Sequence, residues 1–253
     1  MFRLRALSVA LLAPALGALA QPAWSQAPRD LDRACAAVAM LALPDSRITQ
    51  AQAIHPQPQY LVPETAHSPP GPFGGPVRIT RPFCRVAGVV EPAIRFEVWL
   101  PLTGWNGRFE GLGLGAFSGA VPYAQMAAAL AHGYAVGGTD TGHESGFMDA
   151  TWAMTPQGTL NTPVVEDWIY RGIHAMTQKS QAVVQAVYGA RARHSYFVGC
   201  SSGGHQALTE AQRYPDDYDG IVAGAPANYW THLMAGQLWY GLATRVDPAS
   251  SLE

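Results

Sequence analysis

Apolar and polar residues alternate strictly along residues 94–100, and this alternation predicts a strand. A period of two places every second side chain on one face, here the apolar set Ile94, Phe96, Val98 and Leu100. The apolar segment 83–90 predicts a neighbouring strand, and we expect the two to pair in antiparallel fashion. The polar residues between the apolar ones indicate that segment 94–100 is half-buried.

Beyond the turn at residues 103–107, the pattern changes to strands that alternate with helices. Short apolar segments are separated by longer segments with helical periodicity, and Gly189 is a stop signal for the longest helix. We expect strands at 108–112, 134–139, 195–198 and 220–224, and helices at 122–132, 165–188 and 203–214. This succession is typical of a mainly parallel sheet with crossover helices, so the predicted fold class is α/β.

The N-terminal part of the chain divides into a leader and a proline-rich region. Arg3 and Arg5 precede an apolar run at 6–20 that ends in small residues, which predicts a secretory signal peptide over residues 1–27. The expected location is therefore secreted or periplasmic. Within residues 27–82 we expect one short helix at 32–43, with loops and short strands making up the rest.

Composition indicates one globular domain and excludes two classes of partner. The chain has 253 residues, of which 48% are hydrophobic and 13% are charged, so it can bury a substantial core. Its formal net charge is −2, and Lys179 is its single lysine. Without a basic patch we expect no nucleic-acid partner and no membrane partner.

The segment GCSSGG at residues 199–204 is the strongest chemical signal in the chain. It satisfies the pattern G-x-S-x-G with Ser201 at the centre, between a predicted strand and a predicted helix. In that context the pattern predicts a nucleophile elbow, where small neighbours allow the strand and the helix to pass closely. A plain tight turn is the alternative, but it does not explain why every residue around Ser201 is small.

An activated serine also needs donors for the oxyanion that forms during acyl transfer. The backbone N–H of Ser202, at the start of the predicted helix, is the first candidate. The glycine-rich loop at 111–119 follows an early strand and is expected to supply the second, from Gly115 or, alternatively, from Ala116. A phosphate-binding role for this loop is disfavoured, because no Lys-Ser or Lys-Thr pair follows it.

The serine further requires a histidine base and an orienting carboxylate, which follow the nucleophile in this class of fold. The histidines after Ser201 are His205 and His232, and no acid-then-histidine pair suits them. His205 lies in the same predicted helix as the serine. We therefore expect the catalytic aspartate and histidine to lie beyond residue 253.

Several motifs in a fixed order resemble the tannases and feruloyl esterases, a secreted α/β-hydrolase family that includes the hydrolase of mono(hydroxyethyl) terephthalate. The resemblance covers roughly residues 84–233. It rests on FEVWLP at 96–101, WNGRF at 105–109, the glycine loop to Gly119, TDTGH at 139–143, SYFVGCSSGGHQAL at 195–208 and YPDDYDGIVAGAPA at 214–227. One departure is Ala116, because the family has a glycine pair where this chain has Gly115 and Ala116.

The resemblance implies a serine esterase that acts on small aromatic acid esters, feruloyl or galloyl, through an acyl-enzyme on Ser201. It implies that residues 28–233 are the N-terminal part of the catalytic domain and that residues 234–253 begin a lid insertion. A calcium ion is expected in that lid, with no metal site in the present chain. The alternatives are another α/β-hydrolase, such as a lipase or peptidase, and a non-catalytic truncated binding protein.

The chain contains three cysteines, Cys35, Cys84 and Cys200. The family bridges the cysteine before its nucleophile to one after the catalytic histidine, which implies a partner for Cys200 outside this chain. We expect Cys35 and Cys84 to form a disulfide that closes the proline-rich region. A free buried thiol is the alternative state of Cys200.

A few remaining residues are compatible with more than one role. Asp140 and His143 resemble a metal or triad pair, although a structural or pocket-lining role is favoured because they precede the nucleophile. Trp152, Trp230 and Trp239 suit either an aromatic subsite or the core.

Overall fold

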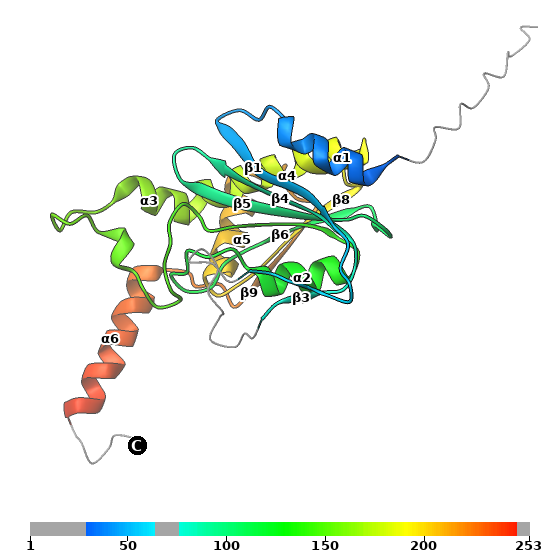
Figure 1. The fold of residues 1–253 in the computed structure, drawn as a ribbon. Helices are drawn as coiled ribbons and strands as arrows, with labels where there is room; N and C mark the ends of the chain where they lie inside the picture. The colour runs from blue at the N-terminus through cyan, green and yellow to red at the C-terminus, as the bar shows by residue number, and fades with distance from the viewer. Residues whose placement is uncertain (1–28, 64–75, 247–253) are drawn as a thin grey trace, which may run out of the picture.

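The computed structural model describes residues 29–63 and 76–246. Its centre is a seven-stranded sheet in the order β1-β4-β5-β7-β6-β8-β9 (Figure 1). The strands are β1 Ser46–Ile54, β4 Phe83–Val90, β5 Ile94–Pro101, β6 Arg108–Leu112, β7 Ala135–Thr139, β8 His194–Cys200 and β9 Gly220–Gly224. The predicted signal peptide at 1–27 lies outside the described residues.

The sheet has an antiparallel half and a parallel half. β1 pairs with β4, β4 with β5, and β5 with β7, all in antiparallel fashion. From β7 onward the order β7-β6-β8-β9 is parallel. The parallel half, with its crossover helices, confirms the α/β class and brings the C-terminal ends of these strands to one edge.

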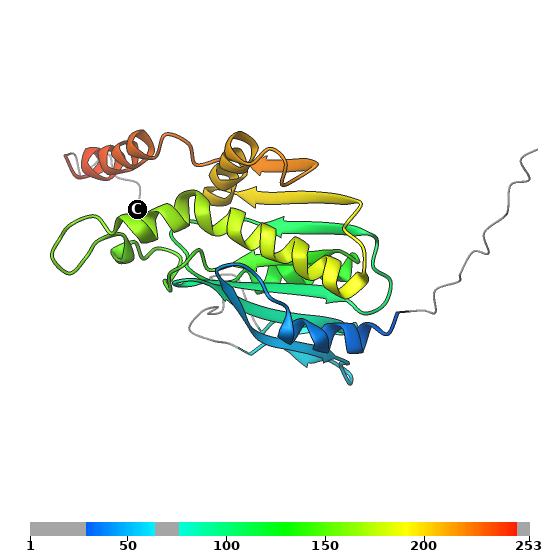
Figure 2. The same cartoon turned by 90° about the horizontal axis from the view of Figure 1, so that it is seen from above.

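Helices cover both faces of the sheet (Figures 1 and 2). On one face lie α1 Leu31–Ala37, α4 Gly172–Tyr188 and α5 Ser202–Arg213; on the other lie α2 Tyr123–Ala131 and a small sheet of β2 Tyr60–Leu61 and β3 Arg78–Ile79. Each face has its own apolar core. Phe96, Met176 and Phe197 belong to the first core, and Trp99 and Met126 to the second.

Two expectations for the strands are wrong. β5 is buried on both faces rather than half-buried, because Glu97 and Trp99 lie under α2 and not in solvent. Residues 46–54, where loops and short strands were expected, form the nine-residue edge strand β1. Its intermediate burial follows from its place at the edge of the sheet, where only one neighbour, β4, pairs with it.

The long helix predicted at 165–188 is interrupted near its start. It consists of α3 Thr162–Glu166, one wide turn η3 Asp167–Arg171 with π geometry, and α4. The wide turn buries Asp167 and Trp168. Gly189 ends α4 with φ 74°, a left-handed conformation that glycine adopts without steric cost, as the stop signal predicted.

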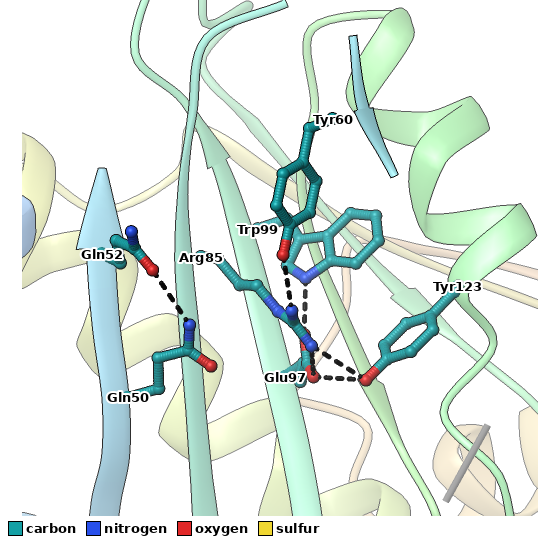
Figure 3. Close-up of polar contacts among 7 residues, drawn as sticks. All are labelled: Gln50, Gln52, Tyr60, Arg85, Glu97, Trp99 and Tyr123. Atoms are coloured by element: carbon teal, nitrogen blue, oxygen red, sulfur yellow. Dashed lines mark hydrogen bonds and ion pairs between the residues drawn. The ribbon is translucent and has the colours of Figure 1, made fainter. Parts of the chain in front are cut away.

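A buried ion pair is the centre of a polar network beneath α2 (Figure 3). Arg85 donates to Glu97 through Nε at 2.9 Å and Nη2 at 2.6 Å. The carboxylate also accepts from Trp99 Nε1 at 2.7 Å and from the Tyr123 hydroxyl at 2.5 Å. Tyr60 accepts from Arg85 Nη1 at 3.0 Å. The network therefore compensates for the desolvation of both charges and joins β4 and β5 to α2.

Cys35 of α1 and Cys84 of β4 form a disulfide, and Cys200 is a free, exposed cysteine. Both bridged residues are fully buried in the first core. The bridge joins the helix at the start of the described chain to the middle of the antiparallel half.

The last helix, α6 Trp230–Val246, extends away from the sheet (Figures 1 and 2) and has no buried residue. Its exposed side chains include Leu238, Trp239 and Tyr240. No helix in the described ranges is both long enough and apolar enough to cross a bilayer.

Candidate active site

Ser201 lies on a strained turn between β8 and α5. Its backbone has φ 61° and ψ −116°, a conformation that costs a residue with a Cβ about 1–3 kcal/mol. Neighbouring backbone compensates for this cost. The Ser201 N–H donates to the Gly224 carbonyl at 3.0 Å, and the Ser201 carbonyl accepts from the N–H groups of His205 at 3.1 Å and Ala227 at 2.9 Å. The side chain of Ser201 is exposed at the head of the helix.

The glycines around Ser201 allow three backbone segments to approach closely. A Cβ on Gly199 would lie 2.1 Å from the Gly203 carbonyl oxygen, and one on Gly203 would lie 2.7 Å from the Leu114 oxygen. A Cβ on Gly204 would lie 2.4 Å from the Gly224 oxygen. These approaches are what the small residues of an elbow permit.

The glycine-rich loop after β6 packs directly against the elbow. The Gly113 N–H donates to the Val198 carbonyl at 2.9 Å, and the Leu114 N–H donates to Gln206 Oε1 at 3.0 Å. The loop then turns at Ala116, whose φ is 46°. A Cβ on Gly115 would meet the ring of Phe147 at 2.8 Å, so a larger residue here would displace that exposed side chain.

The candidate oxyanion donors belong to these two segments. Ser202 is the first residue of α5, where a backbone N–H has no partner within the helix. In the described part of the chain, the N–H groups of Gly115 and Ala116 donate no hydrogen bond either. The turn therefore combines an exposed hydroxyl with unpaired backbone donors from two neighbouring segments, and both loop candidates stay open.

No histidine in the described ranges forms a hydrogen bond with the Ser201 hydroxyl. His205 is partly buried on α5, where desolvation lowers its pKa. His232 is exposed on α6. His143 is buried, its pKa is lowered by desolvation, and its ring stacks on Trp152 with centroids 3.9 Å apart while Nε2 lies 3.2 Å from the Phe117 carbonyl oxygen. Within the described residues, the Ser201 hydroxyl therefore has no histidine as a hydrogen-bond partner.

Asp140 has structural contacts in the turn that follows β7. Its carboxylate accepts from the backbone N–H groups of Arg95 at 2.9 Å and Gly142 at 2.8 Å. Complete burial raises the pKa of Asp140 to about 7, although these hydrogen bonds oppose the shift. The side chain thus holds β5 and the turn together, in agreement with the structural role favoured from the sequence.

An aromatic cluster joins the glycine-rich loop to η3 and to the start of α6. Phe117, from the glycine-rich loop, has its ring centroid 5.5 Å from that of Trp230 and 6.1 Å from that of Trp168. Trp168 and Trp230 are 5.5 Å apart, and Trp152 is also 5.5 Å from Trp168. Trp239, by contrast, is 66% exposed. The sequence alone did not single out Phe117 or Trp168, because their neighbours come from distant segments.

Gln206 is a second residue that sequence reasoning missed. Its side chain is 2% exposed and accepts from the loop residue Leu114, as described above. It lies within the motif SYFVGCSSGGHQAL at 195–208, but the motif assigns it no role, and a glutamine in an amphipathic helix ordinarily faces solvent. Its position becomes informative only when α5 and the loop are seen together.

One group of side chains in the described residues has the composition of a metal site. His174, Glu210 and Asp217 each offer a ligand atom, and these atoms lie within 4.8 Å of one another. His174 Nδ1 pairs with Asp217 Oδ2 at 2.6 Å. Burial, together with the charge of Asp217 and a hydrogen bond to it, raises the pKa of Glu210 to about 8. The raised pKa favours the neutral, protonated form of Glu210, which lowers the negative charge of the cluster.

This cluster is remote from Ser201. Asp217 also lines a cavity of about 400 Å³ together with Arg193 and Ser195, at the start of β8. Ser201 follows the other end of the same strand. The cavity therefore lies at the opposite end of β8 from Ser201.

Comparison with known proteins adds the family context. The model of the family described as tannase and feruloyl esterase matches residues 77–252. An uncharacterized esterase of Xanthomonas campestris pv. campestris is 38% identical over 100% of this chain, which covers 41% of that protein. A probable feruloyl esterase of Arthroderma benhamiae is 42% identical over 59% of this chain and 28% of its own length. The chain thus spans less than half of these relatives.

Solved structures agree with this assignment. The crystal structure of feruloyl esterase B from Aspergillus oryzae superposes with a TM-score of 0.67 and 31% identity, over 78% of this chain and 38% of that one. The tannin acyl hydrolase from Aspergillus niger, with a TM-score of 0.57 and 23% identity over 74% of this chain and 34% of that one, shows the shared fold. The fold is therefore that of the α/β-hydrolases, as the motifs implied.

Proposed function

The chain belongs to the tannase and feruloyl esterase family, and we propose that it is the N-terminal part of a serine carboxylic-ester hydrolase with Ser201 as its nucleophile. The observation that carries this proposal is the geometry of the Ser201 turn. The backbone of Ser201 has a positive φ, and its side chain is exposed at the head of α5. The residue is surrounded by glycines that bring β8, α5 and the loop after β6 together. A turn without a chemical role gives no reason to retain this strain.

In the proposed reaction, the Ser201 hydroxyl oxygen attacks the ester carbonyl carbon and transfers its proton to a general base. The carbonyl oxygen becomes an oxyanion, which accepts hydrogen bonds from the N–H of Ser202 and from that of Gly115 or Ala116. Collapse of this intermediate expels the alcohol, which takes up the proton, and leaves an acyl-enzyme on Ser201. Water then repeats the sequence and releases the acid.

We propose that the base and its orienting carboxylate lie beyond residue 253, in a part of the longer relatives that this chain does not cover. Two observations support this placement. The described histidines do not pair with Ser201, and Asp140 is occupied by backbone donors. The lid with its calcium site belongs to the same proposal.

For the substrate, we propose small esters of aromatic acids. The names of the fungal relatives refer to feruloyl esters, and the cluster of Phe117, Trp168 and Trp230 includes a residue of the loop that packs against the elbow. Aromatic side chains favour an aromatic acyl group through stacked or edge-on contacts. Export is part of the proposal, supported by the sequence of residues 1–27 and by the Cys35–Cys84 disulfide.

The test is covalent labelling and turnover in the protein expressed from its complete gene. A fluorophosphonate probe should label the wild type and the control Ser46→Ala, a site in the edge strand β1, but not Ser201→Ala. Methyl ferulate and a gallate ester should be hydrolysed faster than a triglyceride or a peptide. Labelling of Ser201→Ala at wild-type level contradicts the nucleophile, and a preference for triglyceride or peptide supports another hydrolase. A wild type that neither labels nor turns over any ester supports a binding protein.

A further inference from the structure

Gln206 connects the two segments that carry the candidate oxyanion donors. Its carboxamide Oε1 accepts from the backbone N–H of Leu114 at 3.0 Å, and its Nε2 donates to the backbone carbonyl of Trp168 at 3.3 Å. The side chain is 2% exposed. Both the acceptor and the donor atom of the side-chain amide are therefore hydrogen-bonded, and burial of the side chain keeps water from replacing these partners.

These contacts allow Gln206 to influence the arrangement of the two segments that carry the candidate oxyanion donors. Leu114 directly precedes Gly115, the loop residue whose N–H is a candidate donor, and Ser202 begins the helix on which Gln206 lies. The loop is held on one side by the Gly113 N–H, which donates to Val198 of β8 at 2.9 Å. Gln206 holds the next peptide unit from α5. One helix thus presents one donor through its first residue and fixes the segment that presents the other.

The second contact extends the connection to the aromatic cluster. The carbonyl that accepts from Gln206 belongs to Trp168, whose ring packs near those of Phe117 and Trp230. Phe117 follows Gly115 and Ala116 in the same loop. A single amide therefore constrains the loop at Leu114 and the aromatic wall against which that loop packs.

We propose that Gln206 is a positioning residue of the oxyanion hole, which fixes the spacing between the N–H of Ser202 and the N–H of the glycine-rich loop. This proposal rests on the proposed function. Oxyanion donors act through preorganisation, because a donor displaced from the developing charge loses most of its effect in the transition state. Gln206 therefore affects the chemical step and leaves the binding of the ground state unchanged.

The amide chemistry makes the two contacts separable. Glutamate at this position keeps an acceptor for Leu114 but loses the donor to Trp168, whereas leucine keeps the approximate volume and loses both contacts. The matched control is Gln181→Leu, because Gln181 on α4 also donates through Nε2 to a backbone carbonyl, that of Asp217 at 2.9 Å, far from Ser201.

The experiment uses the full-length enzyme and normalises every rate to Ser201 sites titrated with fluorophosphonate. We expect Gln206→Leu to lower kcat for methyl ferulate about 10- to 100-fold with KM within about twofold. Gln206→Glu, which keeps the acceptor for Leu114 but adds a buried charge beside the Trp168 carbonyl, should also lower kcat, and Gln181→Leu should retain wild-type kcat. A boronic acid inhibitor, which forms a tetrahedral adduct with the serine, should bind more weakly by the same factor as kcat falls. Ferulic acid, a ground-state ligand, should bind as in the wild type.

Three results would overturn the proposal. The first is a wild-type kcat per titrated site in Gln206→Leu, which would make its role purely structural. The second is equal weakening of the boronic acid and ferulic acid, which would mean a general loss of the pocket. The third is a fall of kcat in Gln181→Leu as large as in Gln206→Leu, which would mean that the loss of any such glutamine contact lowers turnover. Because Gln206→Glu is close in shape, it also serves if the leucine variant does not fold. Failure of the proposed function is a separate outcome, since the wild type itself would then show no labelled Ser201 and no turnover.

Discussion

The backbones of Gly113 and Gly203 lie in direct contact, such that a Cβ added to Gly113 would stand 2.7 Å from the Cα of Gly203. These residues are far apart in sequence, one in the loop after β6 and the other in the first turn of α5. Their contact sets how closely the candidate oxyanion loop approaches the Ser201 turn.

The first prediction follows from this contact. Gly203→Ala places a methyl group 2.7 Å from the Leu114 carbonyl oxygen, and the backbone on both sides cannot yield as a flexible side chain would. We expect a loss of about 1–3 kcal/mol in the free energy of unfolding, and of most esterase turnover in the full-length protein. Urea titration and ester hydrolysis measure the two effects.

A matched control is available on α6. At Gly236 an added Cβ meets nothing within 4 Å, so Gly236→Ala should be tolerated and should stabilise its helix by about 0.5–1 kcal/mol. If Gly203→Ala behaved like Gly236→Ala, the close approach of loop and helix would be contradicted.

The second prediction concerns the buried ion pair. Glu97→Ala leaves the guanidinium of Arg85, which is 6% exposed, without its carboxylate, and removes the acceptor of Trp99 and Tyr123. We expect a loss of about 3–5 kcal/mol in the free energy of unfolding. The exposed pair Arg47–Glu91, with side chains 59% and 51% exposed, is the control. Glu91→Gln should cost less than about 1 kcal/mol, and similar losses in both variants would be the contrary result.

The third prediction is a pH dependence of stability due to Glu210. Its pKa is raised from 4.5 to about 8 in the folded protein, so the folded state holds a proton that the unfolded state releases. The free energy of unfolding should therefore fall as the pH rises from about 4.5 to about 8. In Glu210→Gln, position 210 carries no charge, so the free energy of unfolding should fall less over this pH range. The gain in stability over the wild type should be largest near about pH 8.

Chemical denaturation at about pH 5 and about pH 8 measures this difference between the variant and the wild type. Glu166→Gln, an exposed site on α3, controls for the loss of one carboxylate. Parallel pH profiles for Glu210→Gln and the wild type would show that Glu210 ionises normally in the folded protein.

The fourth prediction concerns the cysteines of the 253-residue chain. The Cys35–Cys84 bridge spans a sequence separation of 49, and closing a loop of this size stabilises by up to about 4 kcal/mol on the loop-entropy model. Replacing both cysteines by serine should lower the unfolding midpoint, whereas Cys200→Ser should leave it unchanged. Alkylation without reduction should modify Cys200 alone, and modification of Cys35 or Cys84 would contradict the assignment.

Local patterns were sufficient for much of the fold. The alternation at 94–100, the apolar segment at 220–224 and the stop at Gly189 predicted strand β5, strand β9 and the end of α4, because strand and helix periodicity and glycine's left-handed conformation are properties of neighbouring residues. The strand-turn-helix around Ser201 could be predicted for the same reason. Its role as nucleophile stays a prediction until labelling tests it.

Other features depended on contacts between distant segments. The sequence of β5 looked half-buried because Glu97 and Trp99 are polar or amphipathic, and only the placement of α2, Arg85 and Tyr123 over them explains their burial. Gln206 lies in a motif of the family resemblance, but its role could not be predicted, since its partners Leu114 and Trp168 come from two other segments of the chain. The sequence by itself determined which residues could form the serine turn. The tertiary structure decided how the loop, the helix and the aromatic cluster meet around it, because hydrogen bonds and close packing between remote segments leave no periodic trace in the chain.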